Sequence, residues 1–117
     1  MQALDLTVEE IGPDGATLTM PITPALCREG DILSGQSLAA LADTAMVIAC
    51  TGAMGAVRPV ATTNLDLQFL RPGVGAAIRC TARVTRMGKA LIFTRATMTD
   101  LPSGKDVATA TATFFQP

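Results

Sequence analysis

The chain has 117 residues, of which 49% are hydrophobic and only 16% are charged, and its formal net charge is −1 with a pI near 5.2. This length suits one compact domain, expected to span residues 1–117, and is too short for two ordinary domains. The charge gives no basic field that would attract nucleic acid, and the absence of histidine excludes Ser-His-Asp, Cys-His and His-ligated metal sites.

The three cysteines predict buried, unpaired thiols. Cys27, Cys50 and Cys80 are an odd number and lack the paired spacing of a metal site. The sequence shows no recognisable signal peptide, so we expect a reducing, cytoplasmic environment in which disulfides are rare.

The first third of the chain predicts a hairpin followed by a loop. Residues 4–11 and 16–22 alternate between apolar and polar side chains, and the turn formers at 12–15 separate them. Residues 23–33 combine proline, glycine and charged residues without a period. This segment therefore predicts a loop that leads into a helix.

Residues 34–57 predict the long helix around which the rest of the chain is organised. Asp43 is the only charged residue among them, and the others are apolar or small, which is typical of a helix buried on nearly all sides. The interruption of the apolar run by Asp43, threonines and glycines argues against a membrane span. An unpaired carboxylate in an apolar interior costs several kcal/mol, so Asp43 is the first candidate for chemistry.

Capping residues define both ends of this helix. Ser34 or Ser37 can accept a hydrogen bond from the N–H groups of the first turn. Gly52 and Gly55 are expected to bring the helix to its end.

The remaining sequence predicts four strands, at residues 60–70, 77–85, 90–99 and 107–115. In the first of these, Leu65, Leu67 and Phe69 share one face. In the last, alanines at 108, 110 and 112 alternate with threonines, so one face is small enough to let another element come close. The helix is the expected partner, which gives an antiparallel sheet curled around one helix.

Four segments resemble the hotdog-fold thioesterases, specifically the phenylacetic acid degradation (PaaI) type: SGQSLAALADTA, NLDLQFLRPG, RVTRMGKALIFTRATMTD and VATATATF. The resemblance covers the whole chain, and LADTA and FLRP are its most specific parts. It implies an α+β fold in which an antiparallel sheet wraps around one long central helix. It also implies homodimers, often paired into tetramers, that bind acyl-CoA at the subunit interface without a metal or cofactor.

The family motif, His-Gly-Gly with a catalytic carboxylate nine positions after the His, falls on Ser34, Gly35, Gln36 and Asp43. By resemblance, Asp43 is the general base or, less often, the nucleophile, and the Gly35 N–H polarises the thioester carbonyl. Thr62 aligns with a hydroxyl residue that positions water, and the resemblance implies that it comes from the other subunit. Ser34 and Gln36 replace the His and the second Gly, and we assign them to substrate binding.

The same assignment is chemically consistent. Thioester hydrolysis needs a base that activates water and donors that stabilise the oxyanion, and the first turn of a helix supplies such donors. Arg86 and Lys89, which flank Gly88, are candidates for binding the phosphates of CoA. They are otherwise part of a solvated strand face and turn.

Two functions stay open at this point. One is an acyl-CoA thioesterase, and the other is a non-catalytic protein that binds acyl-CoA or an acyl carrier. In the second case the departures from the family motif at Ser34 and Gln36 mark lost activity. The low charge fraction and the open edges of the predicted sheet favour self-association in either case.

Overall fold

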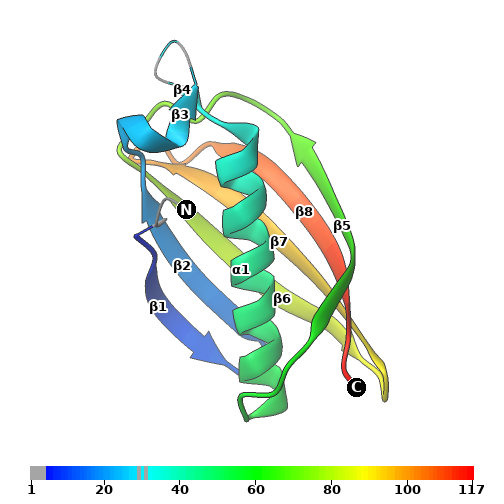
Figure 1. Ribbon diagram of the computed structural model, residues 1–117. Helices are drawn as coiled ribbons and strands as arrows, with labels where there is room; N and C mark the ends of the chain where they lie inside the picture. Colours follow the sequence, from blue (N-terminus) through cyan, green and yellow to red (C-terminus); the bar gives the residue numbers. More distant parts are fainter. Residues whose placement is uncertain (1–4, 29, 31) are drawn as a thin grey trace.

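The computed structural model describes residues 5–28, 30 and 32–117. The predicted start of the first strand, at Leu4, lies outside these residues. Figure 1 shows the elements, which in chain order are β1 (Thr7–Gly12), β2 (Gly15–Pro21), the 3-10 helix η1 (Pro24–Leu26), β3 (Cys27–Arg28), β4 (Ile32–Leu33), α1 (Gly35–Met54), β5 (Ala61–Phe69), β6 (Ala77–Met87), β7 (Leu91–Leu101) and β8 (Asp106–Phe115).

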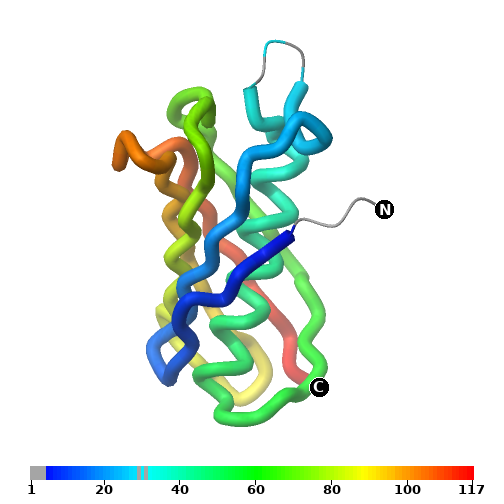
Figure 2. Tube along the Cα trace, turned by 90° about the vertical axis from the view of Figure 1, so that its left-hand side faces the viewer, coloured from blue at the N-terminus to red at the C-terminus, as the bar shows by residue number. Residues whose placement is uncertain are grey.

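Six strands form one antiparallel sheet in the order β1-β2-β6-β7-β8-β5. The helix α1 lies between β2 and β5 in the sequence. It runs along one face of this sheet, as the two perpendicular views show (Figures 1 and 2). The prediction of an α+β hotdog fold is confirmed. Within the described residues β5 pairs with β8 alone, so β5 is an edge strand.

The core lies between the sheet and the helix. The inward-facing alanines of β8, predicted from the alternation, are at most 4% exposed at positions 108, 110 and 112. In the same core, Leu41 and Met46 of the helix are fully buried. Side chains of this size contribute roughly 1.5–3 kcal/mol each when they leave water, so the small strand residues stabilise the fold by letting the large helix residues pack closely.

The ends of α1 follow the predicted capping residues, with one correction. Ser34 is the N-cap, and its hydroxyl oxygen accepts a hydrogen bond from the Ser37 N–H at 3.1 Å. Gly55 ends the helix in the left-handed conformation, at φ 69°. Gly52 does not end the helix: it lies inside it, where a Cβ atom would collide with the carbonyl oxygen of Gly12. Its role is to let β1 approach the helix.

The helix is fully buried on one side only, which corrects the expectation of burial on nearly all sides. Eight of its residues are buried, whereas positions 39, 40, 43, 44, 47 and 48 are half-buried. Length and composition alone would allow α1 to cross a membrane, but core helices meet the same criterion and the buried side of α1 packs against the sheet. The half-buried side leaves apolar surface beside the open edge of β5.

The segment predicted as a loop, residues 23–33, contains short regular elements. The 3-10 helix η1 begins at Pro24, and β3 and β4 pair as a small antiparallel sheet. The Ser37 hydroxyl of α1 donates to the Leu26 carbonyl at 2.9 Å and ties this segment to the start of the helix. The segment therefore forms one wall beside the helix N-terminus.

Candidate active site

Asp43 and Thr62 meet on the half-buried side of the helix. The Thr62 hydroxyl donates a hydrogen bond to Asp43 Oδ1 at 3.1 Å. The Asp43 side chain is half-buried, and Thr62 near the start of β5 is exposed. A carboxylate held in this way keeps a second oxygen with which it can accept a proton or orient a water molecule. We call this pair the base half of the site.

The contact corrects one expectation drawn from the family resemblance. Thr62 and Asp43 come together within one chain, and they do not need to be supplied by different subunits. The physical reason is the course of β5. After the helix ends at Met54, the chain returns along the edge of the sheet and brings Thr62 back beside the middle of α1 (Figure 1).

The start of α1 offers two backbone donors. In an α-helix the first four N–H groups have no partner within the helix ladder, but here the Ser34 N–H donates to the Leu26 carbonyl and the Ser37 N–H donates to Ser34 Oγ. Among the described residues, no partner is found for the N–H groups of Gly35 and Gln36. The helix dipole places partial positive charge at this point, which favours a developing oxyanion.

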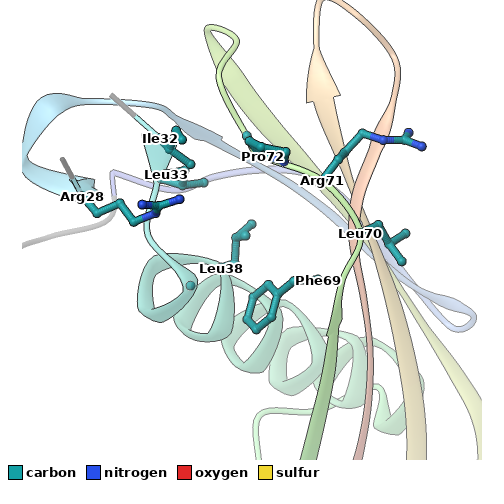
Figure 3. Close-up of a pocket in the computed structure, with 10 residues that line it drawn as sticks. Arg28, Ile32, Leu33, Leu38, Phe69, Leu70, Arg71 and Pro72 are labelled. Atoms are coloured by element: carbon teal, nitrogen blue, oxygen red, sulfur yellow. The ribbon is translucent and has the colours of Figure 1, made fainter. Parts of the chain in front are cut away.

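Gly35 lies against an aromatic ring and an apolar cavity. A Cβ atom at Gly35 would stand 3.3 Å from Phe69 Cζ, so only glycine leaves this contact relaxed. The cavity, of about 310 Å³, is shown in Figure 3 and is lined by Arg28, Ile32, Leu33, Gly35, Leu38, Phe69, Leu70, Arg71, Pro72 and Gly73. We call Gly35, Phe69 and this cavity the carbonyl half of the site.

The base half and the carbonyl half are separated along the helix. Gly35 and Asp43 are eight residues apart, which corresponds to about 12 Å of helical rise. A base and an oxyanion donor that act on one carbonyl must both lie within hydrogen-bonding reach of a single small group. One chain therefore holds the candidate base and the candidate oxyanion donors at two separate places.

The other predicted site residues divide between these places. Ser34 and Gln36 lie at the start of the helix, and the Ser34 hydroxyl is engaged with Ser37. Arg86 and Lys89 lie at the end of the structure near the helix C-terminus, because β6 ends at Met87 and turns there into β7 (Figure 1). Within one chain they do not come together with Gly35.

The buried thiols are not nucleophiles at neutral pH. Burial raises the pKa of Cys50 to about 11 and that of Cys80 to about 12, so both remain protonated. Cys27 is only half-buried, which corrects the expectation for that residue. In the ranges that the structure describes, no three His, Cys, Asp or Glu side chains are grouped closely enough to hold a metal ion.

A second carboxylate, Asp100, is nearly buried and has a structural role. It is 5% exposed, accepts hydrogen bonds from the Gly75 N–H at 2.9 Å and from the Ser103 hydroxyl at 3.0 Å, and joins the start of β6 to the turn after β7. Because both oxygens have partners, Asp100 is a poor candidate for a base. Asp43 therefore remains the candidate for a catalytic carboxylate.

Sequence reasoning did not identify Phe69 as part of the site. The alternation in β5 correctly placed Phe69 on the same face as Leu65 and Leu67, and this was the available signal. Its contact with Gly35 depends on where the end of β5 lies relative to the helix, which alternation does not determine.

Comparison with known proteins agrees with this architecture. The model of the thioesterase superfamily matches residues 30–107. No curated protein matches the sequence. The chain belongs to the thioesterase superfamily.

Solved structures of similar proteins extend this result. A conserved protein from Pseudomonas aeruginosa superposes with a TM-score of 0.90 at 26% identity, covering 97% of this chain and 90% of its own. A variant of the phenylacetic acid degradation protein PaaI from Thermus thermophilus gives a TM-score of 0.86 at 25% identity, with 97% and 95% covered. PaaI from E. coli superposes with a TM-score of 0.87 at 23% identity, covering 97% of this chain and 80% of its own, which shows a shared fold. PaaI-like proteins are thus among its structural relatives.

Proposed function

We propose that this protein is an acyl-CoA thioesterase that hydrolyses an acyl-CoA to a free acid and CoA. The observation that carries the proposal is the Asp43 carboxylate, half-buried and hydrogen-bonded by Thr62 on the open side of the helix. Membership of the thioesterase superfamily supports the same reaction class.

The proposed site forms between two copies of the chain. The helix and β5 run in opposite directions, so the base half lies toward the start of β5 and the carbonyl half at its end. A two-fold axis beside the free edge of β5 would pair two such edges and bring the base half of one chain to the carbonyl half of the other. The dimer would then contain two complete sites and cover the half-buried side of each helix.

In this arrangement the chemistry follows from the residues. Asp43, oriented by Thr62, accepts a proton from a water molecule as the water oxygen attacks the thioester carbon. The N–H groups at the start of the partner's helix stabilise the negative charge that develops on the carbonyl oxygen. The C–S bond then breaks, and CoA leaves as a thiolate that needs no histidine to protonate it.

The test is thiol release from a panel of acyl-CoAs, compared between wild type and three variants. Asp43→Asn keeps the shape of the side chain but removes the base, and we expect kcat to fall by about 10²–10⁴. Gly35→Pro removes one N–H at a helix position where proline is well tolerated, whereas Gly35→Ala keeps it. If kcat of Gly35→Pro is about 10²–10³-fold lower than kcat of Gly35→Ala, the result supports the oxyanion role of the Gly35 N–H.

The alternative, a protein that binds acyl-CoA or an acyl carrier without hydrolysis, predicts a different result. Wild type would release no thiol above background, while acyl-CoA would still bind. Near-wild-type turnover by Asp43→Asn would remove Asp43 from the mechanism.

A further inference from the structure

The cavity beside Gly35 is walled mainly by apolar side chains from separate elements. Ile32 and Leu33 come from β4, Leu38 from the first turns of α1, and Phe69 from the end of β5. Figure 3 shows Leu38 and Phe69 together at the cavity, with the Arg71 guanidinium directed away from them, whereas Arg28 extends from β3 toward the cavity. The part of the wall that Leu38 and Phe69 form, away from Arg28, suits an uncharged apolar group.

Phe69 is unusual because it faces inward yet remains exposed. It shares a face with the half-buried Leu65 and Leu67, but 59% of its surface is accessible. Burying an aromatic side chain of this type is worth roughly 1.5–3 kcal/mol, so the single chain leaves a substantial apolar interaction unmade. A bound apolar group in the cavity would make that interaction.

The ring also lies at the point where the reacting carbonyl would be held. Phe69 Cζ is 3.3 Å from the position of a Cβ on Gly35, and the N–H of Gly35 is the proposed oxyanion donor. A carbonyl bound there would place the next carbons of its acyl group against the ring.

The volume limits the size of that group. A dry cavity of about 150 Å³ takes up a benzene molecule, and this cavity is about 310 Å³. It therefore accommodates an apolar acyl group of medium size.

We propose that this cavity is the acyl-binding subsite, that the substrates carry uncharged apolar acyl groups of medium size, and that Phe69 determines their upper size. This inference rests on the proposed function, because it takes Gly35 as the carbonyl-binding residue. Phe69 contacts the acyl group and sets selectivity without taking part in proton transfer.

The experiment measures kcat/KM for straight-chain acyl-CoAs from acetyl to dodecanoyl. We expect kcat/KM to rise about fourfold per methylene until the cavity is full and then to level off or fall. In Phe69→Ala the optimum should move to chains about two or more carbons longer, because the space of the ring becomes available. Phe69→Trp should move it to shorter chains.

Phe93→Ala is the matched control, since Phe93 is a partly exposed phenylalanine, 37% accessible, on a strand that does not line the cavity. It should leave the chain-length optimum unchanged. An unchanged optimum in Phe69→Ala would overturn the proposal, as would a preference of wild type for acyl groups that end in a carboxylate over apolar groups of the same length.

A binding series separates this proposal from the proposed function. Affinities of the same acyl-CoAs for Asp43→Asn, measured by calorimetry, should rise with chain length up to an optimum. In the Asp43→Asn/Phe69→Ala double variant the chain length of tightest binding should move to longer acyl groups. If wild type hydrolyses none of the thioesters but this dependence is found, the acyl subsite stands and the enzymatic function does not. Hydrolysis or binding that does not depend on chain length overturns the subsite.

Discussion

The two-chain site can be tested by mixing inactive variants. Gly35→Pro disables the carbonyl half and Asp43→Asn disables the base half. In a dimer with one chain of each kind, one site carries both changes and the other carries neither. That second site should be fully active.

The size of the recovery follows from symmetry. Random exchange makes half of the dimers mixed, and each mixed dimer has one intact site out of two. Recovered activity should therefore approach roughly one quarter of wild type. Both parents should be at least about a hundredfold impaired, so the background is small by comparison.

The structure supplies a negative control. Thr62 Oγ1 and Asp43 Oδ1 lie 3.1 Å apart in the same chain, so both residues belong to the same half of the site. Mixing Thr62→Ala with Asp43→Asn should give no recovery, since every site then lacks one of the two groups. Thr62→Ser, which keeps the hydroxyl, should retain most of its activity and shows that the loss in Thr62→Ala comes from the missing donor.

The backbone before Gly35 suits the key substitution, and the close contact of the new Cβ with Phe69 is shared by the Gly35→Ala control. Ser34, the residue before the introduced proline, already has φ −70° and ψ 151°, which is the conformation that a following proline favours. The assay is thiol release after subunit exchange, with differently tagged chains to confirm that mixed dimers have formed. Recovery from Asp43→Asn with Thr62→Ala, together with none from Asp43→Asn with Gly35→Pro, would refute the assignment of residues to the two halves.

Two further predictions concern stability. Gly52→Ala should lower the free energy of unfolding by about 1–3 kcal/mol in urea titrations, because the new methyl group collides with the Gly12 carbonyl; an unchanged midpoint would show that β1 can move away freely. The free energy of unfolding should also fall as pH rises from 9 to 11, by up to about 1.4 kcal/mol per pH unit for each thiol, since unfolded thiols ionise near 9.0 while Cys50 and Cys80 stay protonated when folded. The chain has no Tyr, but Lys89, Lys105 and Cys27 also ionise in this range, so the comparison with Cys80→Ala, which should reduce the slope, isolates the contribution of one buried thiol; equal stability at pH 9 and pH 11 would contradict the prediction.

The main elements could be predicted because local patterns determine them. The alternation of alanine and threonine in β8, the turn formers at residues 12–15 and the capping residue Ser34 each act over a few positions. The β3–β4 pair could not be predicted, because two-residue strands show no period and their pairing depends on the neighbouring helix.

The site was only partly predictable for a related reason. Asp43 stands out in the sequence as the one charge in an apolar helix, whereas Gly35 and Thr62 were identified through the family resemblance. The partners of Asp43 and Gly35, which are Thr62 and Phe69, lie on a strand whose position beside the helix depends on how the sheet curls. Side-chain alternation determines which face a strand residue occupies, and it does not determine which turn of the helix that residue meets.

The positions of these partners also explain why one chain is expected to be inactive. Because β5 returns antiparallel to α1, it completes the environment of Asp43 near one end and that of Gly35 at the other. No movement within a helix can bring together two of its residues that are about 12 Å apart along the axis. In the proposed dimer, a second copy related by a two-fold axis beside β5 would reverse the order of the two halves and so supply to each the function that it lacks. The free edge of β5 and the half-buried side of the helix are therefore the surfaces on which activity should depend.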